Sequence, residues 1–144
     1  MCLAIYISTN KVMPTIPYDQ KSRNFNTEDI TDSEKSLQGI FSLPFIKYIG
    51  SDLGCSCGFR HSLLENDQWL NVVEEEGTEF DNSNHQNLID FISNNNENEK
   101  KVEILACWEG DQNEPIRYHD IVKLMDVLGK DFYFKERGFY TVEL

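Results

Sequence analysis

Three apolar segments with strand-like patterning constrain the fold of this chain more than any other feature. In residues 102–108, VEILACW, the larger apolar side chains occupy alternate positions, so they share one face and Cys107 lies on the other. Residues 2–8, CLAIYIS, and 45–50, FIKYIG, are also rich in β-branched and aromatic residues. A period of two with these residue types is typical of β-strands. We therefore expect a core built around a sheet that contains all three segments.

Other segments predict the elements around this sheet. We expect helices where a capping residue precedes apolar residues three or four positions apart, at 31–40, 82–92 and 120–129. Residues 55–60 are expected to form a further strand, and the C-terminal residues a hairpin that turns at Arg137-Gly138. Residues 65–81 fit a loop or a weak helix, and the pattern does not decide between them.

The length and composition predict one domain over residues 1–144. A chain of 144 residues with 40% hydrophobic residues can bury its own core. Strands and helices alternate without a regular βαβ rhythm. The predicted fold class is therefore α+β: a single domain, a largely antiparallel sheet with two or three helices packed on it, and a C-terminal β-hairpin.

The charge excludes two classes of partner. The chain carries 25 acidic and 13 basic residues, a formal net charge of −12, and its only adjacent basic pair is Lys100-Lys101. Nucleic acids and anionic membrane surfaces would repel such a chain. We expect no nucleic acid and no membrane partner, and retain a protein or a small-molecule ligand.

The N-terminal region predicts a cytoplasmic protein. No basic residue precedes the first apolar run, which ends at Ile7, and no apolar segment approaches the length of a membrane span. The four cysteines are therefore expected to be thiols in a reducing compartment.

Residues 54–61, GCSCGFRH, are the stretch with the highest density of side chains that could bind a metal ion or react. On a straight strand Cys55 and Cys57 would point to one side, and the intervening small residues would leave the other side open for close approach. The favoured interpretation is that both thiols are packed in the core.

A metal site is the alternative interpretation of the same residues. Cys55, Cys57 and His61 would supply three ligands to a zinc ion if the glycines curled the backbone. The fourth ligand would come from one of four residues: Cys107, Cys2, His85 or His119. One intervening residue is shorter than the usual spacing of a zinc ligand pair, so no cofactor is favoured, with zinc as the alternative. A redox role has less support, because the Cys-x-x-Cys spacing is absent.

Residues 107–111, CWEGD, are a second candidate binding segment. Trp108, Glu109 and Asp111 lie where a strand ends, a frequent position for binding residues, although an ordinary turn at Gly110 also explains them. With Arg60 and His61 from the thiol stretch, they complete our set of binding candidates.

Cys2 offers a more remote alternative. Its position after Met1 resembles the start of the N-terminal-nucleophile hydrolases, including the glutamine amidotransferase type. That resemblance implies removal of Met1 and an amidohydrolase that uses Cys2 as nucleophile and its own α-amino group as base.

Four segments, MCLAIYIS, GCSCGFR, ILACWEGD and FYFKERGFYTV, together resemble a small family of uncharacterised bacterial proteins. The resemblance spans nearly the whole chain. It implies a compact bacterial cytosolic domain and assigns no functional residues. Since no complete catalytic constellation is found, we expect a binding role rather than an enzyme, with a metal- or thiol-dependent protein as the alternative.

Overall fold

A computed structural model describes residues 2–72 and 82–144 of the chain. The strands of this part are β1 (Leu3–Thr9), β2 (Asn26–Asp29), β3 (Phe45–Gly50), β4 (His61–Glu65), β5 (Gln68–Asn71), β6 (Lys101–Trp108), β7 (Tyr118–Lys123), β8 (Phe134–Lys135) and β9 (Gly138–Glu143). The helices are α1 (Ser83–Asn95) and the 3-10 helices η1 (Asp32–Gly39), η2 (Ser56–Gly58) and η3 (Leu124–Leu128).

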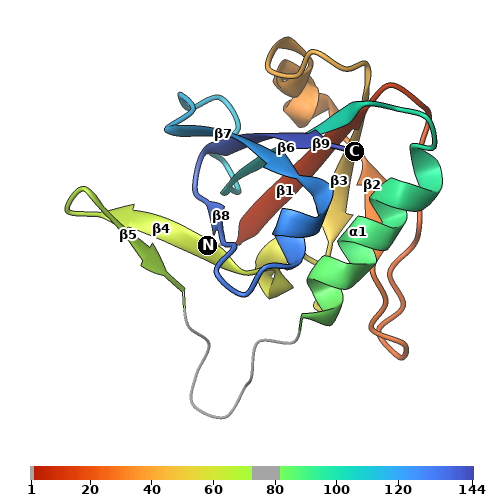
Figure 1. Ribbon diagram of the computed structural model, residues 1–144, viewed down its shortest axis with the longest axis horizontal. Coiled ribbons are helices and arrows are strands. Elements are labelled where there is room, and N and C mark those ends of the chain that lie inside the picture. The colour runs from red at the N-terminus through yellow and green to blue at the C-terminus, as the bar shows by residue number, and fades with distance from the viewer. Residues whose placement is uncertain (1, 73–81) are drawn as a thin grey trace.

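Six strands form the main sheet, in the order β2-β3-β1-β6-β9-β7 (Figure 1). All neighbours are antiparallel except β7 and β9, which run parallel. The three apolar segments predicted as strands are β1, β3 and β6, and they lie side by side. Ile5 of β1 is opposite Ile49 of β3 and Ala106 of β6. The predicted α+β fold class is confirmed.

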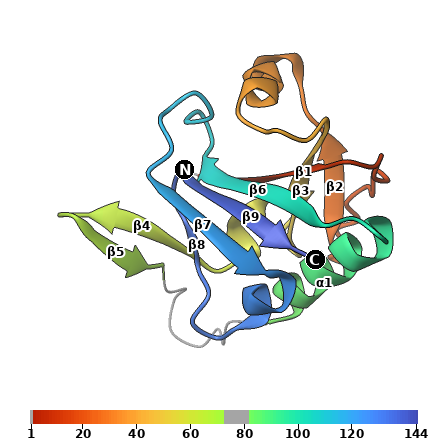
Figure 2. The same cartoon turned by 45° about the horizontal axis from the view of Figure 1, so that its top comes forward.

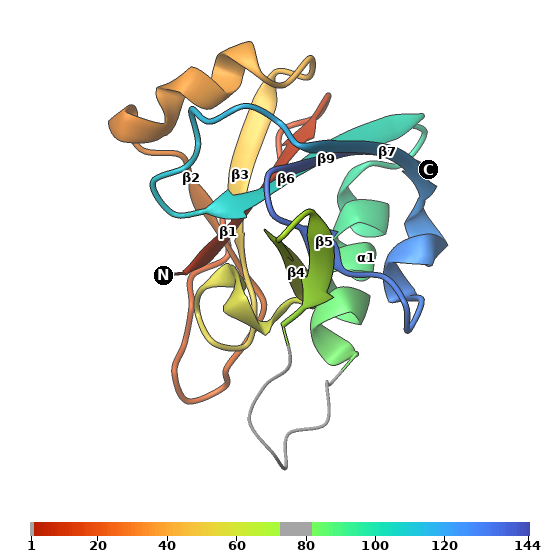
Figure 3. The ribbon, with the colours of Figure 1, turned by 90° about the vertical axis from the view of Figure 1, so that its left-hand side faces the viewer.

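Each face of this sheet carries a hydrophobic cluster. On one face α1 buries Leu88 and Ile92 against Ile5 and Ile104. On the other face Leu37 of η1 packs with Tyr6, Leu105 and Cys107. Figure 3 shows η1 and α1 on opposite sides of the strands. The helices predicted at 31–40 and 82–92 are confirmed as η1 and α1, and Cys107 lies on the opposite face from Ile104, as the alternation predicts.

The small sheet has the order β5-β4-β8, and its hairpin β4–β5 extends from the body of the molecule (Figure 2). Asn66 and Asp67 join the two strands with φ angles of 51° and 61°. Two consecutive positive φ values are what a two-residue hairpin turn requires. A loop or weak helix at 65–81 is therefore wrong for residues 68–71, while residues 73–81 lie outside the described part.

The helix predicted at 120–129 is wrong for residues 120–123 and is confirmed only for the 3-10 helix η3. Residues 118–123 form β7, which pairs with β9, and only the five residues of η3 are helical. Ile121 and Met125, whose spacing of four residues would place them on the inner face of a helix at 120–129, are 67% and 64% exposed. Their helical spacing competes with the backbone hydrogen bonds that β9 offers to an adjacent strand, and pairing with β9 prevails.

The strand predicted at 55–60 is also wrong. Cys55 precedes the turn of 3-10 helix η2, and strand β4 begins only at His61. The remaining expectation is the C-terminal hairpin. Arg137, with φ of 53°, makes the predicted C-terminal turn, and the strands it joins have their ladder partners in different sheets: β8 pairs with β4, and β9 with β6 and β7.

Candidate functional site

Three cysteines from two distant parts of the chain meet at one end of the main sheet. The sulfur atoms of Cys2, Cys55 and Cys57 all lie within 4.8 Å of one another. The antiparallel pairing of β1 with β3 explains the meeting, because β1 begins where β3 ends. The turn that follows β3 therefore lies beside the N-terminal end of β1 (Figure 3). We call Cys2, Cys55 and Cys57 the thiol group.

Ser56 anchors the turn that carries two members of this group. Its side chain is fully buried, and its hydroxyl donates to the carbonyl of Ile49 at 2.5 Å and accepts from the N–H of Ile5 at 2.9 Å. The backbone N–H of Ser56 donates to the hydroxyl of Tyr48 at 3.1 Å. These bonds tie the turn to β1 and β3 and fix where the flanking thiols project.

We expect the substitution Ser56→Ala to lower the free energy of unfolding by about 2 kcal/mol, because it leaves the buried Ile5 N–H without its acceptor. Urea denaturation followed by circular dichroism measures this change. Ser36→Ala, on the exposed surface of η1, is the matched control and should shift stability by less than about 0.5 kcal/mol. Equal effects of the two substitutions would contradict the anchoring role.

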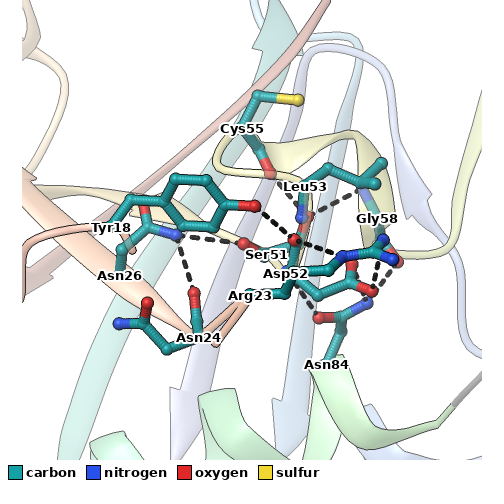
Figure 4. A network of polar contacts seen from close by, with 10 residues as sticks. All are labelled: Tyr18, Arg23, Asn24, Asn26, Ser51, Asp52, Leu53, Cys55, Gly58 and Asn84. Carbon is teal, nitrogen blue, oxygen red and sulfur yellow. Dashed lines mark hydrogen bonds and ion pairs between the residues drawn. The ribbon is translucent and has the colours of Figure 1, made fainter. Parts of the chain in front are cut away.

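A second set of hydrogen bonds holds the same turn from outside (Figure 4). The hydroxyl of Ser51 donates to the carbonyl of Cys55 at 2.6 Å and accepts from the N–H of Gly58 at 3.1 Å. Asn84, at the start of α1, bonds to both the backbone and the carboxylate of Asp52 and donates to the Gly58 carbonyl. The sulfur of Cys55 points away from this network, so the network positions the thiol without occupying it.

Two glycines permit this geometry. Gly54 has φ of +83°, and a Cβ there would lie 2.9 Å from the ring of Tyr18. A Cβ on Gly58 would overlap the hydroxyl of Ser51. The sequence predicts that another group packs closely against these small residues. In the structure, side chains of the protein itself, from Tyr18 and Ser51, occupy that position.

The environment of Cys57 disfavours its free thiolate. The pKa of Cys57 is raised to about 12, chiefly by burial and also by its neighbours Cys55 and Cys2, although a hydrogen bond from the Leu3 N–H acts to lower it. That N–H donates to the Cys57 sulfur at 3.3 Å. A sulfur in this position carries a negative charge at neutral pH only beside a cation.

A cavity of about 450 Å³ adjoins the thiol group. It lies on the sheet face that η1 covers, and its lining includes Cys55, two tyrosines and three glutamates: Tyr6, Tyr48, Glu28, Glu34 and Glu109. Neither Glu28 nor Glu34 is among the binding candidates predicted from the sequence.

Tyr6 and Glu34 are bonded to each other at the wall of this cavity. The Tyr6 hydroxyl donates to the Glu34 carboxylate and accepts from the side-chain amide of Gln112 at 3.0 Å. Burial acts to raise the pKa of Glu34, but the bonds from Tyr6 and Thr31 outweigh it and hold that pKa below its usual value. Burial and the same carboxylate raise the pKa of Tyr6. The pair is therefore a neutral phenol bonded to an ionised carboxylate.

The other residues predicted near the thiols have structural partners. His61 approaches the Phe59 carbonyl through Nδ1 at 2.7 Å, and its ring lies 5.7 Å from that of Trp108. Arg60 is buried and donates to the Val127 carbonyl at 3.3 Å. Within the described residues, the group whose ligand atoms lie close enough together to hold a metal ion contains Cys2. It does not contain His61, which the sequence suggested as a ligand.

The CWEGD segment contributes one residue to the cavity, Glu109. The indole N–H of Trp108 donates to Glu136, and the backbone N–H of Asp111 closes the turn onto the Trp108 carbonyl at 2.9 Å. The backbone N–H of Glu109 also donates to the Cys2 carbonyl at 2.9 Å, which fixes Cys2 beside the cavity wall.

The remaining suggested fourth ligands lie elsewhere in the described structure. Cys107 is buried in the second hydrophobic cluster, and burial raises its pKa to about 12. His85 of α1 contacts Phe59 and Phe134 in the core. His119 lies on β7, against Phe139.

Comparisons with protein-family models, with curated proteins and with solved structures give no match. The resemblance to a bacterial family therefore stays a prediction. Among the described residues, no helix combines the length and apolarity needed to cross a membrane. The fold and the site define an α+β domain with three converging thiols beside an acidic cavity.

Proposed function

We propose that this protein binds a thiophilic metal ion, zinc in the first place, through Cys2, Cys55 and Cys57. The observation that carries the proposal is the convergence of three sulfur atoms within 4.8 Å of one another. With Zn–S bonds of about 2.3 Å, tetrahedral geometry separates sulfur ligands by about 3.8 Å. A contraction of about 1 Å, within reach of side-chain rotation at partly exposed cysteines, would complete the chelate.

Two further features support metal binding over a redox pair. A single residue separates Cys55 from Cys57, and a disulfide across that spacing would be strained. The Leu3 N–H bond to Cys57 is the kind of outer contact that orients a metal-bound thiolate and spreads its charge. The Ser56 and Ser51 bonds hold the backbone of the turn, so little ordering is needed when an ion binds.

The test is the metal content of the full-length, untagged protein after reconstitution with zinc under reducing conditions. We expect about one equivalent per chain for the wild type, and below about a tenth of an equivalent for Cys2→Ser, Cys55→Ser and Cys57→Ser, because two thiolates chelate far more weakly than three. Inductively coupled plasma mass spectrometry after gel filtration measures it.

Cys107→Ser is the matched control, because it removes a thiol that lies outside the group and should leave the zinc content unchanged. Circular dichroism of each variant separates loss of a ligand from loss of the fold. A wild type that retains no zinc, or zinc content that Cys55→Ser leaves unchanged in a folded protein, would reject the proposal.

A further inference from the structure

The thiol group supplies three of the four ligands that zinc prefers. Within the described residues, no fourth His, Cys, Asp or Glu joins it. Zinc sites with three protein ligands leave the fourth position to water or to an exogenous ligand. Cys55 belongs to the thiol group and also lines the cavity of about 450 Å³, so that position adjoins the cavity.

The charge of the cavity selects what can enter. Glu28 comes from β2, Glu34 from η1 and Glu109 from the turn after β6, so three separate parts of the chain contribute glutamates to one cavity. Three thiolates with one zinc ion would add a net charge of −1. Several negative charges around a partly enclosed space repel anions and concentrate cations there.

The aromatic walls add a second preference for cations. The rings of Tyr6 and Tyr48 meet edge to face, with centroids 5.7 Å apart, and both line the cavity. Tyrosine ring faces attract ammonium and guanidinium groups. The volume falls within the range of small-molecule sites, about 300–1,000 Å³, and is too small for a folded partner.

We propose that the cavity binds a small organic cation that also carries a neutral nitrogen donor, and that this nitrogen takes the fourth position on the metal. The inference rests on the proposed metal site and names its ligand class. The metal holds the donor atom, while Glu28 and Glu109 hold the cationic group. An anionic ligand of the same size is rejected.

The test uses full-length protein loaded with Co²⁺ in place of zinc, because the visible bands of Co²⁺ report its ligands. Three probes carry the same imidazole donor: histamine with an added ammonium, imidazole itself, and imidazole-4-acetate with an added carboxylate. At a pH where the ring is neutral and the amine protonated, we expect histamine to bind on the order of tenfold more tightly than imidazole, and imidazole-4-acetate more weakly than both.

The variant Glu28→Gln/Glu109→Gln should reduce the affinity for histamine to that for imidazole and leave imidazole binding unchanged. Glu34 is retained, because it caps η1 through Thr31. Glu143→Gln, an exposed carboxylate at the end of β9, is the control and should keep the histamine preference.

The outcomes separate the two proposals. Absence of sulfur-to-cobalt charge-transfer bands in the loaded wild type would reject the metal site itself. With those bands present, spectra that no probe changes, equal affinities for histamine and imidazole, or a preference for imidazole-4-acetate would each overturn the ligand assignment alone.

Discussion

Replacing Glu136 with alanine is expected to lower the free energy of unfolding by about 3 kcal/mol, one of the two largest effects that we predict. The carboxylate is buried between the two sheets and accepts from three donors: the Leu64 N–H of β4 at 2.7 Å, the indole of Trp108 in β6, and the Arg117 guanidinium at 3.1 Å. Alanine leaves all three without this acceptor. Urea denaturation followed by far-ultraviolet circular dichroism measures the loss.

Two control substitutions test whether the loss of stability comes from the hydrogen bonds that the Glu136 carboxylate accepts. Glu136→Gln keeps one acceptor oxygen and should have an intermediate effect. Glu143→Ala, an exposed carboxylate on β9, should change stability by less than about 0.5 kcal/mol. A Glu136→Ala protein as stable as the Glu143→Ala protein would show that the bonds to Glu136 add nothing to the joining of the sheets.

Nothing near Glu136 in the sequence indicates this role. Its partners come from two strands and from the loop before β7, and a glutamate beside Arg137-Gly138 has the local appearance of a solvated turn residue. The apolar strands β1, β3 and β6 could be predicted because a run of apolar, β-branched and aromatic residues is a local property of the sequence, and strands buried on both faces of a sheet require such runs. The polar edge strand β2, of sequence NTED, has no such pattern and was missed.

The wrong predictions share a physical cause. In each segment the local pattern favours one conformation, but hydrogen-bond partners far away in the sequence stabilise another. Residues 55–60 have a strand-like composition, yet the Ser56 hydroxyl finds the Ile49 carbonyl and the Ile5 N–H, and the chain turns. Residues 120–129 have helical spacing, yet β9 offers a strand to pair with. The β4–β5 hairpin was missed because Asn66-Asp67 lacks the glycine that usually marks such a turn.

The site was predictable only in part. Cys55 and Cys57 were singled out from their spacing, and Cys2 was one of four suggested partners. Choosing among those four requires knowing that β1 and β3 are antiparallel neighbours, which brings residue 2 to the end of β3. Glu109 was predicted as a binding residue, whereas Glu28 and Glu34 reach the cavity only through β2 and η1, whose placement the sequence does not reveal.

The stability of the protein is expected to fall by about 3 kcal/mol between about pH 6.5 and pH 4 because of His85 alone. The pKa of His85 is lowered to about 4, chiefly by burial and also by the nearby Arg60 charge, although a hydrogen bond to Val127 opposes both. The hydrogen bonds require a neutral ring: Nδ1 lies 2.9 Å from the Val127 carbonyl, and Nε2 accepts from the Arg60 N–H at 2.9 Å. Protonation would place two donors face to face.

The direction of this change in stability with pH follows from proton binding. Between these two pH values the unfolded chain binds a proton at His85 that the folded protein does not, so stability is retained above about pH 6.5 and lost as the pH falls. His85→Gln can donate and accept in the same directions without titrating, and should remove this slope. Carboxylates titrate in both proteins, so the difference between the two urea-denaturation curves isolates His85.

His119→Gln, an exposed histidine on β7, should retain the wild-type slope. Should His85→Gln not fold, ¹⁵N chemical shifts of the wild-type imidazoles at pH 5 give the same answer, because the His85 ring must then be neutral with its proton on Nδ1. A protonated His85 ring at pH 5, or parallel pH profiles for the wild type and a folded His85→Gln protein, would show that the packing between α1 and η3 tolerates the charge.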